Sequence, residues 1–427
     1  MSQGALPGFR DFYPEQLANR NYLIGVWRDV ARRYGFVEYD GPPLEPLDLY
    51  TRKSGEEIVG QLYAFTDKAG REVALRPEMT PTLARMVSAK ANAMRKPIRW
   101  FSVPQLFRYE RQQKGRLREH FQLNVDIIGE ASVAADAELL AVAIDVMRAV
   151  GLTSADVRAR VSDRRLLTAV LAHAGVEAGQ MGAVFAAIDK AGREPRALTL
   201  DKIGKIVSEA KARRSIEKVL DNSTNLDALA KQFRDAPNVV DEISHLREYL
   251  RFLDALGVGD WVDFDLSIVR GLAYYTGKVF ELFDAKRELR AICGGGRYDD
   301  LLSTIGGVDL PALGFGMGDV VLGELLRSRD LIPAPDLAPE YWVAADDDAL
   351  LPDVMRVAGR LRSKSRSVEY ALKSQALARQ LKTASSAGVR SFVLLRRDDY
   401  PKGNVTVKTL SDGSERNLSL DDFLASL

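Results

Sequence analysis

Five cationic side chains lie close together in the segment FRYERQQKGRLREHFQLNVDIIG, which spans residues 107–129. The cluster consists of Arg108, Arg111, Lys114, Arg116 and Arg118. A solvated charge run is the more frequent explanation for such a cluster. Arginine predominates here, however, and the planar guanidinium group forms paired hydrogen bonds with phosphate oxygens. The segment therefore predicts a site for a nucleotide phosphate or a nucleic-acid backbone.

The residues after this cluster predict a strand with two different faces, because successive strand side chains point to opposite sides. The apolar face has Phe121, Leu123, Val125 and Ile127, and the polar face has Gln122, Asn124 and Asp126. A half-solvated strand is one interpretation of this alternation. Asn and Asp are poor strand formers, however, and three short polar groups in register equally favour the lining of a pocket.

Three further segments have side chains suited to binding or catalysis. Glu78 and Thr80 in LRPEMTPT could receive an ammonium group, although a surface turn is the better explanation of this segment taken alone. Arg270 ends an alternating strand and precedes Gly271 in VRGLAYYTGKVFE, where a hairpin with aromatic core residues is the simpler interpretation. The glycines of ICGGGRYDDLL allow close backbone approach.

Several classes of site are disfavoured. ALGFGMGDVVLGELL has Val321 where a dinucleotide fingerprint needs glycine, and Lys278 is followed by Val279, so no P-loop motif occurs. Cys293 is the only cysteine and only three histidines are present, which disfavours zinc sites and Cys–His nucleophilic catalysis. Electrostatic stabilisation of phosphoryl chemistry by arginine remains.

Composition indicates an ordinary globular protein. The 427 residues include 60 Lys+Arg and 59 Asp+Glu, a net charge of +1, so a polyanion must bind local patches. No apolar stretch approaches the roughly 18 residues of a membrane span, and the N-terminus lacks the pattern of a secretory signal. A single cysteine fits a reducing compartment, so we expect a cytoplasmic protein with no membrane association.

The order of predicted elements indicates an α+β fold in several parts. Strand pairs joined by hairpins predict a largely antiparallel sheet, built from residues 1–162 and 251–328. DFDLSIVRG and KVFELFD are expected to pair with each other within it. Residues 163–250 are helical and highly charged, which predicts an inserted helical subdomain. After a proline-rich linker at 327–340, alternating strands and helices predict a small α/β domain at 338–427.

Four segments in this order, RPEMT, FRYERQQKGRLREHFQ, VRGLAYYTGKVFE and CGGGRYD, resemble the histidyl-tRNA synthetase family of class II aminoacyl-tRNA synthetases. The resemblance covers nearly the whole chain. It implies a homodimer whose antiparallel catalytic sheet, flanked by helices, carries the first two class II motifs in residues 1–162. It also implies activation of L-histidine with ATP and Mg²⁺, transfer to the 3′ end of a tRNA, no tightly bound protein-ligated metal, and a C-terminal anticodon-binding domain.

The resemblance assigns a set of residues to histidine. These residues are Glu78, Met79, Thr80, Arg108, Gln122, Asp126, Arg270, Tyr274 and Tyr275. Glu78 and Thr80 are expected to hold the α-amino group. Asp126, together with Tyr274 or Tyr275, is expected to recognise the imidazole ring.

The resemblance assigns ATP to Arg108, Glu110, Arg116 and Arg297. Arg108 and Arg270 are the expected catalytic residues. Arg108 contacts the α-phosphate and the amino-acid carboxylate, and Arg270 stabilises charge on the α-phosphate during in-line attack.

Two departures from the family pattern lie on the strand at 119–128. Asp126 is one methylene shorter than the glutamate that the family commonly has there. REHFQ reverses the usual order of Phe and His, which moves His120 to the opposite strand face.

The third departure is in GFGMGDVVL, which has Asp319, Val320 and Val321 where the third class II motif usually ends in Glu-Arg. Losing a pre-organised charge contact costs about 2–4 kcal/mol of transition-state stabilisation. Arg116 and Arg297 are the replacements that we consider. The altered motif also leaves a second hypothesis open, a catalytically inactive histidine-sensing regulatory subunit of ATP phosphoribosyltransferase. Retention of Arg108, Arg270 and the C-terminal domain favours the ligase.

Overall fold

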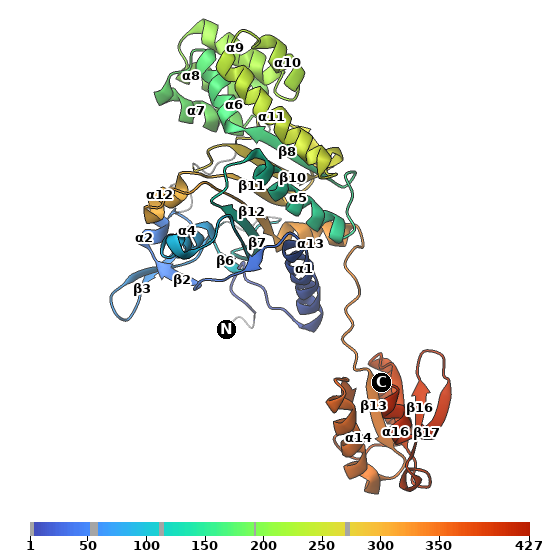
Figure 1. Cartoon of the computed structure of the whole chain (residues 1–427). Helices are drawn as coiled ribbons and strands as arrows, with labels where there is room; N and C mark the ends of the chain where they lie inside the picture. Colours follow the sequence, from blue (N-terminus) through green and yellow to red (C-terminus); the bar gives the residue numbers. More distant parts are fainter. Residues whose placement is uncertain (1–3, 52–58, 111–114, 192–193, 270–273) are drawn as a thin grey trace. The chain divides into compact units, whose positions relative to one another are not determined.

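A large sheet forms the centre of the N-terminal unit, Met1–Pro333, in a computed structural model that describes residues 4–51, 59–110, 115–191, 194–269 and 274–427 (Figure 1). Its strand order is β1-β5-β7-β12-β11-β10-β8-β9, with β6 paired to β7. The strands are β1 (Val37–Glu38), β5 (Ile98–Ser102), β6 (Gln105–Phe107), β7 (Glu119–Ile128), β8 (Val157–Asp163), β9 (Val262–Phe264), β10 (Lys278–Asp284), β11 (Cys293–Arg297) and β12 (Ala312–Gly318). The described pairings are antiparallel except β1–β5 and β8–β9, which confirms the predicted α+β class.

Helix α5 (Val133–Ala149) covers the middle of this sheet, where it contacts β7, β11 and β12. Its sequence, VAADAELLAVAIDVMRA, is apolar around most of its circumference, as expected for a helix buried on more than one side. Helix α1 (Pro14–Arg33) packs against α5. Burial of these apolar faces supplies the main core and leaves the other sheet face for the site.

A smaller sheet has the order β2-β4-β3, made of Leu44–Pro46, Glu72–Leu75 and Tyr63–Thr66. Strands β3 and β4 form a hairpin, with Thr66 opposite Glu72 and the turn at 67–71. Short helix α2 (Asp48–Thr51) and helix α4 (Thr80–Ser88) lie beside it. The described residues of this part also form helices α12 (Leu301–Gly306) and α13 (Asp319–Ser328) and the 3-10 turn Ala91–Ala93.

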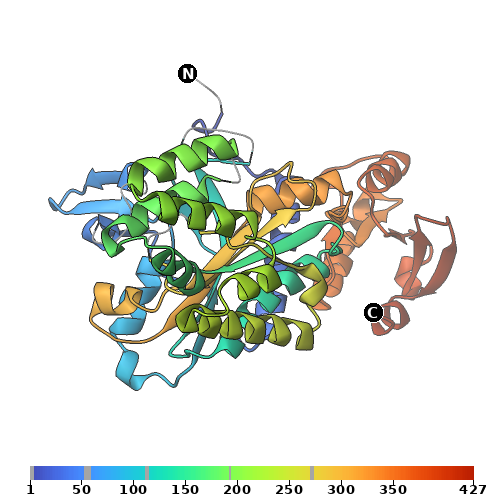
Figure 2. The same cartoon turned by 90° about the horizontal axis from the view of Figure 1, so that it is seen from above.

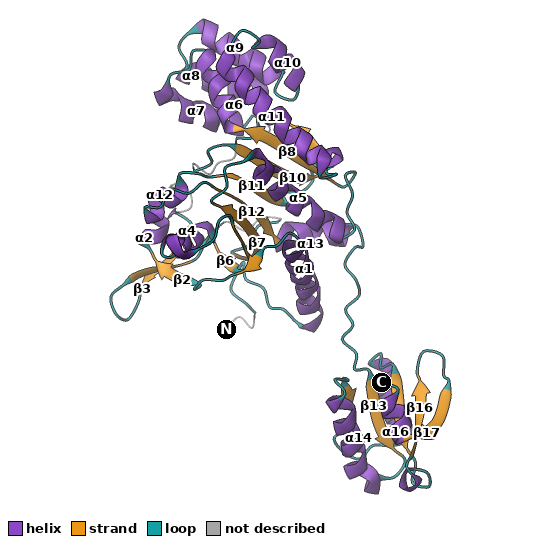
Figure 3. Ribbon diagram, viewed as in Figure 1, coloured by secondary structure: helices purple, strands orange, loops and turns teal. Residues whose placement is uncertain are grey.

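Six described helices lie between β8 and β9 in the chain and gather beside β8 (Figures 1 and 3). They are α6 (Arg164–His173), α7 (Ala178–Asp189), α8 (Arg196–Ile206), α9 (Ala210–Asp221), α10 (Leu226–Gln232) and α11 (Pro237–Ala255), followed by the 3-10 turn Gly259–Trp261. Asp163 starts this run by accepting a hydrogen bond from the Arg165 amide at 2.8 Å, which caps α6. The helical run continues past residue 250 to Ala255.

The expected pairing of DFDLSIVRG with KVFELFD is wrong. Strand β9 pairs in parallel with β8, and β10 pairs with β8 and β11, so β8 lies between the two segments. Figure 2 shows the central sheet from above, with the inserted helices over it.

The C-terminal unit, Ala334–Leu427, has a five-stranded sheet in the order β14-β13-β15-β16-β17. Its elements are β13 (Tyr341–Ala345), α14 (Leu351–Ser363), β14 (Val368–Glu369), α15 (Leu377–Ser386), β15 (Ser391–Leu395), β16 (Asn404–Thr409), β17 (Glu415–Ser419) and α16 (Leu420–Ala425), with 3-10 turns at Asp348–Leu350 and Tyr400–Lys402. The alternating α/β order is as predicted, whereas β17 and α16 were not. In neither unit does a described helix combine the length and apolar character that crossing a membrane requires.

Candidate active site

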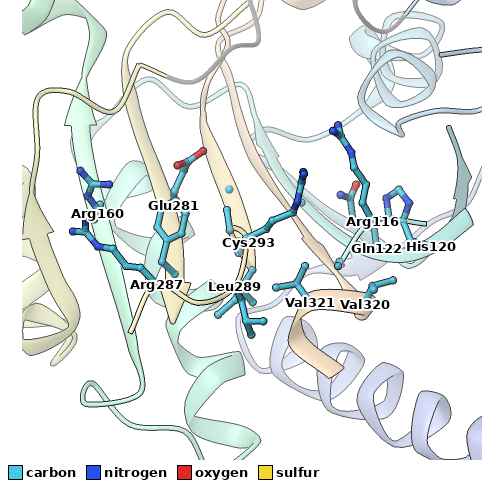
Figure 4. Close-up of a pocket in the computed structure, with 18 of the residues that line it drawn as sticks. Arg116, His120, Gln122, Arg160, Glu281, Arg287, Leu289, Cys293, Val320 and Val321 are labelled. Atoms are coloured by element: carbon cyan, nitrogen blue, oxygen red, sulfur yellow. The ribbon is translucent and has the colours of Figure 1, made fainter. Parts of the chain in front are cut away.

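A cavity of about 700 Å³ opens on the face of the main sheet opposite α5 (Figure 4). Its walls come from the segment leading into β7, from β8, from the β10–β11 hairpin and from the start of α13. The arginines that line it are Arg108, Arg116, Arg160, Arg287 and Arg290. Guanidinium groups from three separate segments therefore meet at one hollow, which favours an anionic ligand.

The polar face of β7 borders this cavity, and the glycines of β12 make room for it. Gln122 lines the cavity, and Asp126 follows on the same face. A Cβ atom on Gly316 would stand 2.8 Å from Nε2 of Gln122, and one on Gly314 would stand 2.0 Å from Oδ1 of Asp126. The alternating glycines of GFGMG are therefore needed because the neighbouring strand carries functional side chains.

Asp126 belongs to a chain of polar and aromatic contacts deep beside β7. The Tyr298 hydroxyl donates to its carboxylate. The Tyr298 ring meets the Tyr274 ring edge-on, with centroids 5.8 Å apart, and the Tyr274 hydroxyl lies 3.5 Å from Oε2 of Glu78. Tyr275 packs against Tyr274 at 5.1 Å. Four residues expected at the amino-acid site thus share one neighbourhood, and Tyr298 is a member that the sequence reasoning missed.

Burial raises the pKa of Asp126 to about 7, although the Tyr298 hydrogen bond acts to lower it. The unfolded-state pKa is about 3.9. Between these values the folded protein binds more protons than the unfolded chain, so this group destabilises the fold increasingly as pH rises through the window. The wild-type protein should therefore lose stability relative to Asp126→Asn between about pH 4 and pH 7.

Thermal or urea unfolding of both proteins from pH 5 to pH 8 measures this difference. Parallel stability profiles would show that the carboxyl of Asp126 keeps an ordinary pKa in the fold. The isosteric amide still accepts the Tyr298 hydroxyl, so the comparison isolates the charge.

Arg108 joins the cavity to the Glu78 segment. Its Nε donates to the carbonyl of Pro77 at 2.9 Å, immediately before Glu78. Glu110 also lines the cavity, is buried, and forms an ion pair with Arg116. Its Oε1 is a buried oxygen without a hydrogen-bond partner among the described residues. An orphaned carboxylate oxygen at a cavity wall suits a ligand amino group or a metal-bound water.

His120 lies in the cavity wall beside these cations. Burial, assisted by the positive charges of Arg108 and Arg10, lowers its pKa to about 3. The imidazole is therefore neutral at physiological pH and adds no charge to the site. Its place on the cavity face agrees with the reversed Phe-His order.

Met79 and Thr80 lie at the start of α4. Met79 is fully buried, with its sulfur 3.9 Å from Nη1 of Arg76, and Thr80 is the first residue of the helix. The buried Met79 side chain and the start of α4 at Thr80 therefore fix the backbone that follows Glu78.

One expected site arginine does not line the cavity, and another cannot be compared with it. Arg270 lies outside the described residues, as do Arg111 and Lys114 of the cationic cluster. Arg297 is 3% exposed and does not line the cavity. Its Nε contacts Asp136 of α5 at 3.0 Å, and Nη1 contacts Asp299 at 3.2 Å. Because Asp136 and Asp299 bind the guanidinium group of Arg297 inside the protein, we withdraw Arg297 from the expected ATP site.

The altered third motif has a structural role at the start of α13. The Asp319 carboxylate accepts the Phe121 amide of β7 at 2.9 Å and pairs with Arg10 at 2.9 Å. Arg10 also binds Glu119 at 2.6 Å. Val320 and Val321 line the cavity (Figure 4). This turn therefore ties the N-terminal segment to β7 and presents an apolar wall.

No group of three or more His, Cys, Asp or Glu side chains in the described ranges is arranged to hold a metal ion. An antiparallel sheet with an arginine-lined cavity beside a polar strand face is the arrangement of a class II synthetase catalytic domain.

Comparisons with known proteins agree. A family model described as histidyl-tRNA synthetase matches residues 8–318, and one described as an anticodon binding domain matches residues 341–427. A histidine–tRNA ligase of Opitutus terrae is 42% identical over 99% of this chain and 97% of its own. The chain belongs to the histidyl-tRNA synthetase family, as expected from its motifs.

Two solved structures show the same fold. The histidyl-tRNA synthetase of Nostoc sp. PCC 7120 superimposes with a TM-score of 0.83, at 23% identity over 100% of this chain and 99% of its own. A Bacillus halodurans protein described as an ATP phosphoribosyltransferase regulatory subunit/histidyl-tRNA synthetase gives a TM-score of 0.74, at 20% identity over 93% of this chain and 99% of its own.

Proposed function

We propose that this protein is a histidine–tRNA ligase. The observation that carries the proposal is the meeting of an arginine-lined cavity with the polar face of β7 in a chain of this family. The histidine carboxylate attacks the α-phosphorus of ATP, the bond to the β-phosphate breaks, and pyrophosphate leaves. The tRNA 3′-terminal hydroxyl then attacks the acyl carbon of the adenylate, and AMP leaves.

Histidine lies along the polar face of β7 in this proposal. Glu78 and Thr80, with Met79 between them, bind the α-amino group, and Gln122 lies against the amino acid. The imidazole meets Asp126 and the phenolic group of Tyr274 or Tyr275. The pairing of the Asp126 carboxylate with the Tyr298 hydroxyl supports this assignment, because the bond fixes the acceptor in one orientation. A site built to hydrogen-bond its substrate discriminates by about 10⁴–10⁵ against a non-bonding analogue.

ATP occupies the cavity itself. Arg108 contacts the α-phosphate and the histidine carboxylate, Arg116 and Glu110 seat the nucleotide, and Arg270 stabilises charge on the α-phosphate. The orphaned Oε1 of Glu110 and the Glu281 carboxylate at the wall fit a Mg²⁺ ion that arrives with the triphosphate. When bound, that ion neutralises phosphate charge.

Amino-acid-dependent pyrophosphate exchange, measured with each of the twenty amino acids, tests this function. Exchange with histidine alone supports the ligase. Histidine binding without any exchange would instead support the regulatory subunit, the alternative that Val320 and Val321 favour. Exchange with another amino acid would overturn the histidine assignment.

We further propose that the C-terminal unit binds the anticodon stem and that the protein acts as a cytoplasmic homodimer. Deleting residues 338–427 should weaken tRNA binding by about tenfold or more, because the contacts proposed between this unit and the tRNA are removed. Histidine-dependent pyrophosphate exchange should be spared. Filter binding and exchange assays on the same truncated protein measure both, and unchanged tRNA affinity would refute the anticodon role.

A further inference from the structure

Two hydroxyl groups are buried beside the polar face of β7 without a hydrogen-bond partner among the described residues. They belong to Ser102 of β5, which is 0% exposed, and to Tyr39, which follows β1. A buried polar group without a partner costs folding free energy, so nearly all such groups in native structures are satisfied by protein, water or a ligand. The two hydroxyls therefore point to a ligand group that binds beside them.

Backbone pairing places both side chains on the face of the sheet that carries the proposed histidine site. In the pairing of β5 with β7, Ser102 stands opposite Asn124. Trp100 stands opposite Asp126 in the same pairing. Directly opposite residues of an antiparallel pair share a sheet face, so Ser102 lies on the face of Asp126. The Tyr39 ring packs against Trp100, with centroids 5.2 Å apart, and reaches the same face.

Tyr39 also belongs to the neighbourhood of the other expected site residues. It packs with Tyr274 and Tyr298 in one apolar cluster. Two residues later, a Cβ atom on Gly41 would stand 3.5 Å from Cε of Met79, in the segment assigned to the α-amino group. The chain around Tyr39 therefore borders both the aromatic residues and the α4 segment of the proposed site.

The two hydroxyls together have a donor to spare. Burial, assisted by the negative charge of Asp126, raises the pKa of Tyr39 well above its ordinary value, so the phenol keeps its proton at physiological pH. The Ser102 hydroxyl acts in the opposite direction on this pKa, because the two hydroxyls are neighbours. Each has one O–H donor. A hydrogen bond between them would use one donor, and the other would still need an acceptor.

A neutral imidazole ring offers such an acceptor, because one of its nitrogens is a donor and the other an acceptor. Asp126 can accept the ring N–H. The Tyr298 hydroxyl already donates to Asp126, and the Tyr274 hydroxyl lies 3.5 Å from Oε2 of Glu78. The hydroxyls of these two tyrosines are thus directed to carboxylates, and the ring nitrogen that accepts still needs a donor.

We propose that Tyr39 and Ser102 are specificity-determining residues for histidine, and that their hydroxyl pair donates a hydrogen bond to the imidazole nitrogen that Asp126 does not bind. This inference rests on the proposed function, because it adds two residues to the imidazole end of that site. A ring without nitrogen leaves the pair unsatisfied, and a polar site rejects a non-bonding analogue in this way.

Equilibrium binding of L-histidine and of β-(2-thienyl)-L-alanine to the full-length Tyr39→Phe variant tests the inference. The thienyl ring has five members like imidazole but no nitrogen. Loss of one hydrogen bond should weaken histidine binding by about tenfold. Thienylalanine should bind weakly and with the same affinity in variant and wild type, so discrimination between the two amino acids should also fall by about tenfold. ATP affinity should be unchanged.

Ser102→Ala is the second variant and should lower histidine affinity in the same way. Because the two hydroxyls act as one donor pair, the double variant should lose little more than either single variant. A double variant that lost the full product of both effects would show that the hydroxyls act independently and would overturn the shared donor.

Tyr34→Phe is the matched control. It removes the same phenolic hydroxyl at a residue whose O–H donates to Asp145 of α5 at 2.7 Å, and should leave histidine affinity unchanged. Wild-type histidine affinity in both Tyr39→Phe and Ser102→Ala would overturn the inference. Equal losses of histidine and thienylalanine affinity would also overturn it, because they would indicate a structural effect. If the wild type bound histidine without pyrophosphate exchange, the proposed function would fail while the binding result still stood.

Discussion

Replacing Arg108 by alanine should lower histidine-dependent pyrophosphate exchange by a factor of about 10² to 10³, the loss typical of a pre-organised donor that stabilises transition-state charge. The hydrogen bond from Nε to the Pro77 carbonyl fixes the guanidinium between the Glu78 segment and the cavity. Arg108 therefore needs little reorganisation when negative charge develops on the α-phosphate. Steady-state exchange at saturating histidine and ATP measures the effect.

Arg118→Ala controls for damage to the arginine-rich segment. The Arg108 amide donates to the Arg118 carbonyl at 2.9 Å, so the two residues are adjacent in the fold. The Arg118 side chain, however, stacks on Tyr109 at 4.2 Å and does not line the cavity. This variant should keep exchange within a few-fold of the wild type. Equal losses in both variants would assign the effect to the segment's conformation, and normal exchange in Arg108→Ala would remove Arg108 from the reaction.

Local patterns predicted the elements whose partners are close in the chain. The alternation from Phe121 to Ile127 predicted a two-faced strand, and the structure places Leu123 and Val125 in the core and Gln122 at the cavity. The pairing of β9 and β10 failed because neighbouring strands along the chain pair only about two-thirds of the time. Here β8, which precedes the whole helical insertion, lies between them. Such long-range choices leave no local signal.

The glycine-rich strand β11 explains why Arg297, predicted for the ATP site, faces the core, and why Tyr298 was not predicted at the site. Arg297 shares a strand face with Gly295, where a Cβ atom would meet Phe315 and Phe280 of the main core. The two-residue period of a strand thus directs Arg297 toward α5. Tyr298 is one residue further and reaches Asp126 on the site side. The sequence indicates the two-residue period of this strand, but it does not indicate which face of the strand packs against α5.

Replacing Arg297 by methionine should reduce the free energy of unfolding of the N-terminal unit by about 3–5 kcal/mol, because removing one partner leaves a buried charge uncompensated. Arg297 contacts Asp136 and donates to the carbonyls of Glu130 and Ser132 at 3.0 Å and 3.3 Å. Once Arg297 is replaced, Lys278 is the only described cation that remains within 4.0 Å of the Asp136 carboxylate.

The pH dependence of this loss separates charge from packing. Burial already raises the pKa of Asp136 despite the neighbouring cations, and loss of Arg297 should raise it further. The stability gap between variant and wild type should therefore narrow as pH falls and the carboxyl takes up a proton.

Arg165→Met is the matched control for the ion pairs of this region. Arg165 binds the same Asp299 at 3.0 Å, but its side chain is 50% exposed, so its loss should cost only about 0–1 kcal/mol. Urea unfolding of both variants at several pH values, followed by ATP binding, makes the comparison. ATP affinity should be unchanged in Arg297→Met under conditions where the variant stays folded, since its guanidinium binds the interior. A loss confined to ATP affinity, with stability intact, would return Arg297 to the nucleotide site.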